Sequence, residues 1–218
     1  MRCKRHQRSA ATLCPLWHSS PSYRLSVRRI GLFGGSFDPV HLGHLIVARS
    51  AAEQLRLHVV RFIPARIQPF KTGRELAAAQ HRLAMLELAV AGEPSFLVDD
   101  REIRRPGTSY TIDTVRELRA EAPDDRLCLM VGADTALDFT EWREALEISR
   151  LASITVLTRP GIDVSLGTVP AAVIEVPAVD ISATEVRRRV REGEPINELV
   201  PAAVAAYIAS HGLYSTED

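Results

Sequence analysis

The chain has 218 residues, 46% of them hydrophobic and 25% charged, which is the composition of an ordinary globular protein with one sizeable core. No apolar run approaches the roughly 20 residues that span a bilayer, so no membrane association is expected. Three cysteines without a CxxC pair indicate neither a disulfide framework nor a zinc site. They suit a reducing compartment, and we expect a cytoplasmic protein.

The formal net charge of zero hides an uneven distribution along the chain. The first 29 residues carry seven Lys and Arg and no acid, which leaves 20 basic and 27 acidic residues in the remainder. This acidic body argues against nucleic acid as the main partner and favours a small substrate. Residues 1–26 lack the apolar core of a secretory signal, so we expect a disordered basic extension, with a transit peptide as the alternative. A single domain is expected over residues 27–218.

From residue 27 onward, short β-branched runs alternate with segments of helical period. Strands are expected in RRIGLFG, HVVRFIPA, SFLVDD, LCLMVGA, ASITVLTR and AAVIEV. Helices are expected near residues 43–56, 76–91, 111–121, 141–149, 183–192 and 200–211. This alternation predicts an α/β fold, a doubly wound and mainly parallel sheet of Rossmann-like type with C-terminal helices. Such sheets bind ligands at the carboxyl ends of their strands.

The loop after the first expected strand reads GLFGGSFDPVHLGH, Gly31 to His44. Gly34 and Gly35 are expected to allow positive φ and the close approach of a ligand to the main chain. His41 and His44 stand at i, i+3 spacing on one face of the following helix, whose N-terminus favours an anion. Neither the dinucleotide pattern GxGxxG nor the P-loop pattern occurs here. From the residues alone, a plain tight turn and a zinc site at the two histidines stay open.

GGSFDPVHLGH resembles the GG[ST]FDPxHxGH signature of the HxGH nucleotidyltransferase superfamily. The resemblance implies an ATP site in which both histidines face the triphosphate and His44 contacts the α-phosphate. Further on, DISATEVRRR resembles the ISSTxxR signature, in which a helix start and its arginine hold the β- and γ-phosphates. The ATP-binding residues implied by the resemblance are Gly34, Gly35, Ser36, Phe37, His41, His44, Asp134, Ile181, Ser182, Thr184 and Arg187.

The chain departs from these signatures in two places. Ala183 replaces the second serine of ISSTxxR, and IPARIQPFK has Gln68 and Phe70 where the family's loop commonly reads PPHK. Lys71 remains, and a flexible ammonium suits a transferring phosphate. The expected catalytic residues are His44, His41, Lys71 and Arg187. From the residues alone, Lys71 is equally an exposed loop lysine, and DISATEVRRR an ordinary helix capped by a hydroxyl.

Three further runs, RPGTSYTIDTVREL, VGADTALDFTEW and TRPG, narrow the resemblance. Together with the closing LVPAAVAAYIASHGLY, they are similar to bacterial nicotinate-nucleotide adenylyltransferases from residue 29 to residue 214. The implied nicotinate mononucleotide-binding residues are Ser109, Tyr110, Thr111 and Trp142. Independently, Thr108, Ser109 and Thr111 cluster at the start of an expected helix, and that helix end can present main-chain N–H donors to an acidic group such as the carboxylate of nicotinate. Trp142 in an amphipathic stretch is equally a core residue.

The reaction implied by the resemblance joins Mg·ATP and nicotinate mononucleotide to give deamido-NAD and pyrophosphate, with Mg²⁺ as the cofactor. The acceptor phosphate is already ionised, so catalysis reduces to positioning and charge stabilisation. Asp134 is expected near the ribose of ATP or the metal. Two alternatives stay open. One is an adenylyltransferase that prefers nicotinamide mononucleotide or another phosphate, and the other is a non-catalytic nucleotide-binding or sensor protein.

Overall fold

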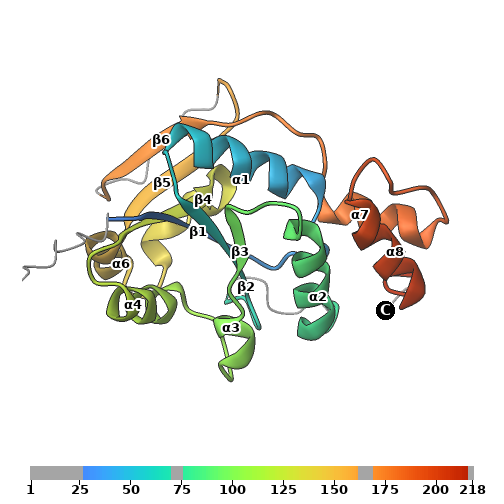
Figure 1. Ribbon diagram of the computed structural model, residues 1–218, viewed down its shortest axis with the longest axis horizontal. Coiled ribbons are helices and arrows are strands. Elements are labelled where there is room, and N and C mark those ends of the chain that lie inside the picture. Colours follow the sequence, from blue (N-terminus) through green and yellow to red (C-terminus); the bar gives the residue numbers. More distant parts are fainter. Residues whose placement is uncertain (1–26, 70–75, 162–168, 216–218) are drawn as a thin grey trace, which may run out of the picture.

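Figure 1 shows the computed structural model, which describes residues 27–69, 76–161 and 169–215. Its six strands form one parallel sheet in the order β3-β2-β1-β4-β5-β6. They are β1 Arg29–Gly35, β2 Val59–Pro64, β3 Phe96–Val98, β4 Arg126–Gly132, β5 Ser153–Thr158 and β6 Ala171–Glu175. All six predicted strands are confirmed. The strand order reverses between β1 and β4, where ligands bind in folds of this type.

Six helices follow the predicted pattern, with boundaries that shift by a few residues. They are α1 Leu42–Gln54, α2 Ala79–Val90, α4 Thr111–Glu121, α6 Ala145–Leu151, α7 Ala183–Arg191 and α8 Ala202–Ser210. Three short turns were not expected: α3 Arg101–Arg104, α5 Ala133–Ala136 and η1 Phe139–Glu141. α5 and η1 both follow β4, at the edge of the sheet where the site is expected.

The helix predicted over residues 141–149 is wrong in its first part. Trp142 is extended and Glu144 takes the left-handed conformation with a φ of 55°, so α6 begins only at Ala145. Trp142, Ala145 and Ile148 keep a three-residue spacing, and a hydrophobic pattern cannot distinguish that spacing from a continuous helix.

The alternating side chains of the strands divide the core into two layers, one on each face of the sheet. Ile30 and Leu32 of β1 pack with the apolar faces of α4 and α6. Val60 and Phe62 of β2 pack instead with α1, α2 and the C-terminal helices. In Figure 1, α1 accordingly lies on one side of the sheet, and α4 and α6 on the other. The doubly wound prediction is therefore correct.

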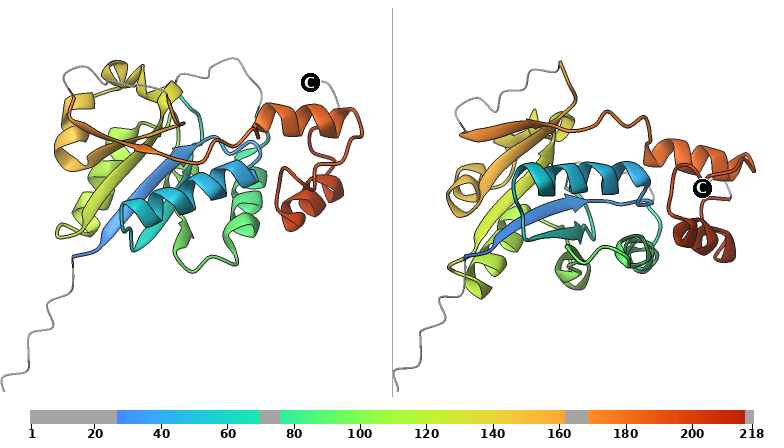
Figure 2. Two further views of the ribbon diagram at one scale, coloured as in Figure 1. Left: turned by 90° about the horizontal axis from the view of Figure 1, so that it is seen from above. Right: turned by 45° about the horizontal axis from the view of Figure 1, so that its top comes forward.

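The C-terminal part returns to the first helices of the chain. A long connection leads from β6 to α7, and α7 and α8 lie together at one end of the molecule (Figure 2). The main-chain N–H of Leu42 donates to the carbonyl oxygen of Leu199 at 2.8 Å, which joins the start of α1 to the segment before α8. Segments from the two ends of the described chain therefore meet beside the β1–α1 loop.

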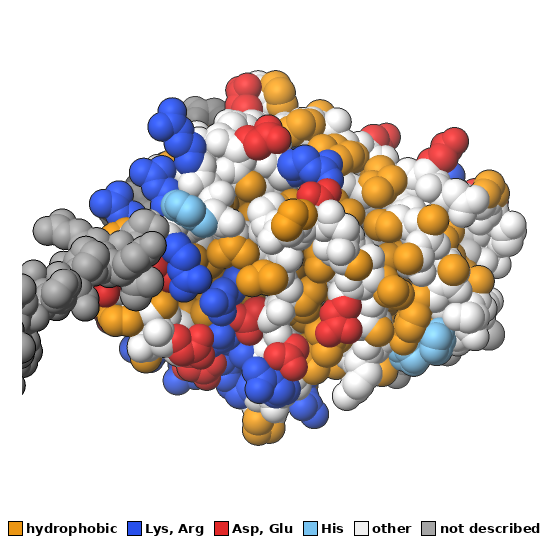
Figure 3. All heavy atoms as spheres, viewed as in Figure 1, with side chains coloured by type: hydrophobic (Ala, Val, Ile, Leu, Met, Phe, Trp, Pro, Cys, Tyr) orange, Lys and Arg blue, Asp and Glu red, His pale blue; other side chains and the backbone are white. Residues whose placement is uncertain are grey.

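Cys128 is a buried free thiol in β4, and burial raises its pKa. Cys3 and Cys14 belong to the predicted basic extension over residues 1–26, which lies outside the described residues. Within the described ranges, no helix is long and apolar enough to cross a membrane. On the face shown in Figure 3, arginine and acidic side chains lie intermixed over α3 and α4, where Arg101 pairs with Glu121 at 3.0 Å.

Candidate active site

A cavity of about 990 Å³ opens at the carboxyl ends of β1 and β4, a volume suited to a small-molecule ligand. The predicted site residues that line it are Gly34, Gly35, Ser36, Phe37, His44, Ser109, Tyr110, Thr111, Asp134, Trp142 and Arg187. Four other predicted residues do not line it but belong to the segments that carry His44 and Arg187: His41, Ile181, Ser182 and Thr184. Lys71 lies outside the described residues.

The two glycines of the β1–α1 loop have different surroundings. A Cβ added to Gly34 would meet nothing within 4 Å, whereas one added to Gly35 would lie 3.1 Å from the ring of Phe37. Neither glycine has positive φ, so that expectation is wrong, and Phe37 itself takes the left-handed conformation with a φ of 48°. Gly34 leaves open space for a ligand at the main chain, and Gly35 makes room for the aromatic ring.

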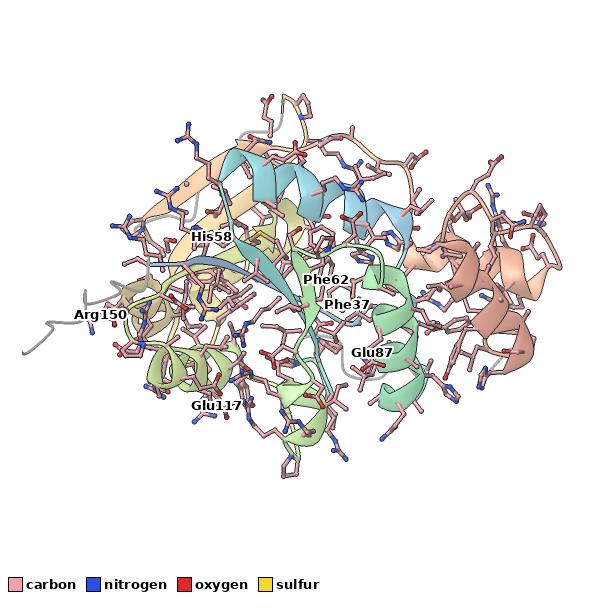
Figure 4. All side chains as sticks on the ribbon, in the orientation of Figure 1. Phe37, His58, Phe62, Glu87, Glu117 and Arg150 are labelled. Atoms are coloured by element: carbon pink, nitrogen blue, oxygen red, sulfur yellow. The ribbon has the colours of Figure 1, made fainter. Side chains whose placement is uncertain are left out.

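Phe37 is only 2% exposed and packs beneath the β1–α1 loop. Its ring centroid lies 5.8 Å from that of Phe62, and Figure 4 shows the two rings close together between the sheet and α2. The ring of His44 packs edge-on against Phe37 with centroids 5.1 Å apart. This aromatic cluster holds the imidazole of His44 in place at the cavity wall.

The two histidines stack on each other at the start of α1, with ring centroids 3.7 Å apart and planes 28° from parallel. The main-chain N–H of His41 donates to Nδ1 of His44 at 3.2 Å. Because Nδ1 accepts this hydrogen bond, the neutral imidazole carries its proton on Nε2. A Cβ on Gly43 would lie 3.0 Å from Nδ1 of His41, so a side chain here would require the stacked ring to shift by a few tenths of an ångström.

The ring of His41 packs against His44 and is itself uncharged. The side chain is buried, and burial lowers the pKa of His41 to about 4, so it is neutral near pH 7. Its Nδ1 is buried and has no hydrogen-bond partner among the described residues. Two stacked imidazoles can avoid mutual repulsion only if at least one stays neutral, and burial makes His41 that one.

The helix α7 begins beside the same loop. Ser182 is its N-cap and accepts from the main-chain N–H of Glu185 at 3.1 Å, which confirms the predicted cap. One turn later, Arg187 donates through Nη2 to the hydroxyl of Thr184 at 3.1 Å and through Nη1 to the main-chain oxygen of Asp38. Ala183, the departure from ISSTxxR, lines the cavity. The helix start and its arginine therefore face the β1–α1 loop.

Asp38 was not predicted as a site residue, although its carboxylate is 3% exposed and lines the cavity. Its Oδ1 accepts from the hydroxyl of Tyr214 at 2.7 Å and from the main-chain N–H of Ala77 at 3.1 Å. Its Oδ2 lies 3.6 Å from Nη1 of Arg187. No local pattern links residues this far apart in the chain.

Arg82 of α2 was also missed, although it is only 1% exposed. Its Nη1 donates to the main-chain oxygens of Ser36 and Ala65, both at 2.7 Å, and its Nε donates to that of Ala77 at 3.0 Å. Burial lowers the pKa of Arg82, and the nearby Asp38 carboxylate opposes this. The sequence could have indicated this burial, because Arg82 stands three residues before Met85 on the buried face of α2, whereas a surface arginine would lie on the other face.

The residues before α4 are anchored to the segment after β2. The hydroxyl of Ser109 accepts from the main-chain N–H of Arg66 at 2.9 Å, and the N–H of Ser109 donates to the oxygen of Ile67 at 2.9 Å. Tyr110 is the N-cap of α4, with no hydrogen bond from its side chain. The first N–H groups of α4 have no partner within the helix, so this end is suited to an acidic group.

Behind that helix start lies a buried acid that the motifs did not indicate. Glu102 is 8% exposed, lines the cavity and accepts from the hydroxyl of Thr114 at 2.7 Å. Burial raises the pKa of Glu102, although the hydrogen bond from Thr114 and the positive charge of Arg105 lower it in part. It is held by polar neighbours instead of projecting freely at a ligand.

Trp142 lies between the core and the cavity. Its ring packs on Phe139 with centroids 5.0 Å apart, yet it also lines the cavity. Its Nε1 is buried without a hydrogen-bond partner among the described residues. The neighbouring Arg143, missed from sequence, places its guanidinium carbon 4.9 Å from the ring centroid of Tyr110. An aromatic face and a cation therefore flank the start of α4.

Asp134 follows β4 in the short helix α5, exposed on the cavity wall. In the described part of the chain, no group of three or more His, Cys, Asp or Glu side chains could hold a metal ion. The zinc site considered for the two histidines therefore has no third ligand there.

Residues 32–189 match a family model described as cytidylyltransferase-like. Two solved structures of a Plasmodium falciparum nicotinic acid mononucleotide adenylyltransferase, complexed with APC and with NaAD, align with TM-scores of 0.70 and 0.71. At 20% and 19% identity over 87% of this chain and 98% of the other, this likeness concerns the fold. Together with the cavity at the β1–α1 loop, the match defines a nucleotidyltransferase of the cytidylyltransferase-like class.

Closer relatives narrow this class. A probable nicotinate-nucleotide adenylyltransferase of Thermomicrobium roseum is 46% identical over 197 residues, 86% of this chain and 92% of the relative. One from Thermus thermophilus is 46% identical over 186 residues, 85% of this chain and 99% of the relative. The chain belongs to the nicotinate-nucleotide adenylyltransferase family.

Proposed function

We propose that the protein transfers the adenylyl group of ATP to nicotinate mononucleotide, giving deamido-NAD and pyrophosphate in NAD biosynthesis. The observation that carries this proposal is the membership of the chain in the nicotinate-nucleotide adenylyltransferase family over most of its length. The cavity supports it, because it is lined by His44 and Arg187 and also by the start of α4 and Trp142. Location in the cytoplasm is part of the same proposal, since the relatives are bacterial enzymes.

The proposed mechanism is an in-line attack on the α-phosphorus by the phosphate oxygen of nicotinate mononucleotide. This phosphate is ionised near neutral pH, so no side chain has to remove a proton. His44 donates through Nε2–H to the α-phosphate, and Arg187 with the start of α7 holds the β- and γ-phosphates of the departing pyrophosphate. Lys71 is a further cation for the transferring phosphate. His41 contributes to catalysis by holding the imidazole of His44 in position.

On the acceptor side, the nicotinate carboxylate lies at the first N–H groups of α4, bordered by Tyr110 and Thr111. Charge-assisted hydrogen bonds from N–H donors favour this carboxylate over the neutral amide of nicotinamide. Trp142 stacks near the pyridine ring, and Arg143 adds a cation at the same end. These contacts make the site selective for the acidic acceptor.

The Mg²⁺ of the reaction enters as Mg·ATP. Mg²⁺ commonly binds through one or two carboxylates together with substrate phosphates, so a dedicated cluster of protein ligands is not required. Asp134 fits this arrangement, since its exposed carboxylate lies on the cavity wall, near the ribose of ATP or the metal. The ion neutralises charge on the phosphates, while the protein orients them.

The proposal is tested by supplying Mg·ATP with nicotinate mononucleotide, nicotinamide mononucleotide or phosphopantetheine and measuring initial rates of pyrophosphate release. We expect the highest kcat/KM with nicotinate mononucleotide. A higher value with nicotinamide mononucleotide would refute the substrate assignment. ATP binding without pyrophosphate release from any acceptor would refute the enzymatic function.

A further inference from the structure

We propose that the hydroxyl of Tyr214 is a positioning group for ATP, acting through Asp38 on the arginine that faces the triphosphate. The inference rests on the proposed use of ATP, but its central test needs only ATP binding. Tyr214 lies in the last described segment, after α8, whereas Asp38 lies in the β1–α1 loop. The C-terminal segment would thereby become part of the phosphate site without touching a phosphate.

The first observation is the geometry at the Asp38 carboxylate. Oδ1 accepts from the hydroxyl of Tyr214 at 2.7 Å and from the main-chain N–H of Ala77 at 3.1 Å. Two donors on one oxygen fix the plane and direction of the carboxylate. Oδ2, buried and without a hydrogen-bond partner among the described residues, is then directed to the guanidinium of Arg187 at 3.6 Å.

The second observation is the position of Arg187. Its Nη1 donates to the main-chain oxygen of Asp38, and its Nη2 to the hydroxyl of Thr184 at 3.1 Å. The side chain is 12% exposed and lines the cavity, so its direction is set by these contacts. An unpaired carboxylate at this position would repel phosphates. Because the carboxylate of Asp38 pairs with Arg187, it instead orients the guanidinium.

The third observation is that the hydroxyl of Tyr214 stays protonated and can act as a hydrogen-bond donor. Burial and the negative charge of Asp38 both raise its pKa, so the hydroxyl keeps its proton throughout the working pH range. Its backbone has a φ of 62°, a left-handed conformation that a residue of this size rarely adopts. The surrounding contacts therefore over-determine the placement of this side chain.

The chain offers a matched control. Tyr207 of α8 places its hydroxyl 3.0 Å from Nδ1 of His81 on α2, so it also joins the C-terminal part to the body of the protein. Neither Tyr207 nor His81 lines the cavity. Tyr207→Phe therefore removes a comparable hydrogen bond with no connection to Asp38.

The experiment compares wild type, Tyr214→Phe and Tyr207→Phe by titration calorimetry with Mg·ATP and by thermal unfolding. Phenylalanine keeps the ring and removes only the hydroxyl. We expect Tyr214→Phe to weaken ATP binding about three- to ten-fold, as for other residues that act through a neighbour. Tyr207→Phe should bind ATP like wild type, although both variants lose a similar amount of thermal stability. In turnover, Tyr214→Phe should raise KM for ATP and leave KM for the acceptor unchanged.

A second pair of variants tests the route through Arg187. In an Arg187→Gln background, Tyr214→Phe should cause little further loss of ATP affinity, because the group it orients is absent. Equal ATP affinity of wild type and Tyr214→Phe would overturn the proposal, and so would equal weakening by the two tyrosine variants or full additivity with Arg187→Gln. If wild type binds ATP but does not adenylylate nicotinate mononucleotide, the proposed function fails while the ATP titrations still decide the role of Tyr214.

Discussion

At the scale of single residues, His44 is the group on which the proposed chemistry depends most. Removal of one well-placed donor commonly lowers turnover about 10²- to 10³-fold, and we expect at least this loss of kcat for His44→Ala. His58→Ala is the control, because His58 accepts from the main-chain N–H of Arg29 at 2.9 Å and does not line the cavity. Initial rates of pyrophosphate release measure both. Near-normal turnover of His44→Ala would remove the assigned role.

His41 predicts a pH dependence of stability. Its pKa is lowered by burial from the ordinary value of 6.5 to about 4, so between these pH values the unfolded chain binds a proton that the folded protein does not. Stability is therefore fully present above pH 6.5 and falls as the pH falls, by about 2 kcal/mol at pH 5. Urea unfolding at pH 7 and pH 5 should show a smaller fall in His41→Gln than in wild type. Identical falls would contradict the buried neutral imidazole.

At the scale of elements, Arg82 ties the β1–α1 loop, the segment after β2 and the start of α2 together. Arg82→Met leaves several buried carbonyl oxygens without a donor, and we expect a loss of about 3–5 kcal/mol in the free energy of unfolding. Arg49→Met, which removes an exposed pair with Glu93, should cost at most about 1 kcal/mol. Urea unfolding of both variants measures the difference, and equal losses would refute the structural role.

The start of α1 depends on the absence of a side chain between the two histidines. Gly43→Ala would shift the ring of His41 by a few tenths of an ångström, since the new Cβ lies 3.0 Å from Nδ1, and we expect a loss of turnover because the stacked His44 shifts with it. Gly92→Ala is the control, because a Cβ there meets nothing within 4 Å. Unchanged kcat in Gly43→Ala would show that the stacked arrangement is not needed.

Elements and local motifs were predictable from the sequence, whereas contacts between distant segments were not. The six strands and the closeness of the two histidines follow from period and spacing, which are local properties, whereas the stacking of the two rings and the place of His41 as N-cap before α1 were not predicted. The bond from Tyr214 to Asp38 joins residues 176 positions apart, and the break at Glu144 depends on a left-handed backbone that no hydrophobic pattern reveals. Arg82 was in principle readable from its helical face, but charge alone suggested a surface residue.

At the scale of the whole molecule, the strand order brings the β1–α1 loop, the segment after β4 and the start of α7 to one edge of the sheet. The β1–α1 loop and α7 carry groups suited to phosphates, and the start of α4 together with the segment after β4 carries groups suited to an acidic pyridine nucleotide. This division of the cavity accounts for a reaction without a side-chain nucleophile, because two bound substrates need only be aligned and their charge stabilised.

The most direct test of this account is the fate of the α-phosphate of ATP. ATP labelled at the α-phosphate is incubated with Mg²⁺, nicotinate mononucleotide and the protein, and the products are separated and identified by mass spectrometry. We expect the label to appear in deamido-NAD, with one pyrophosphate formed for each dinucleotide. Label that stays in ATP, or that leaves in ADP with release of inorganic phosphate, would contradict adenylyl transfer at this site.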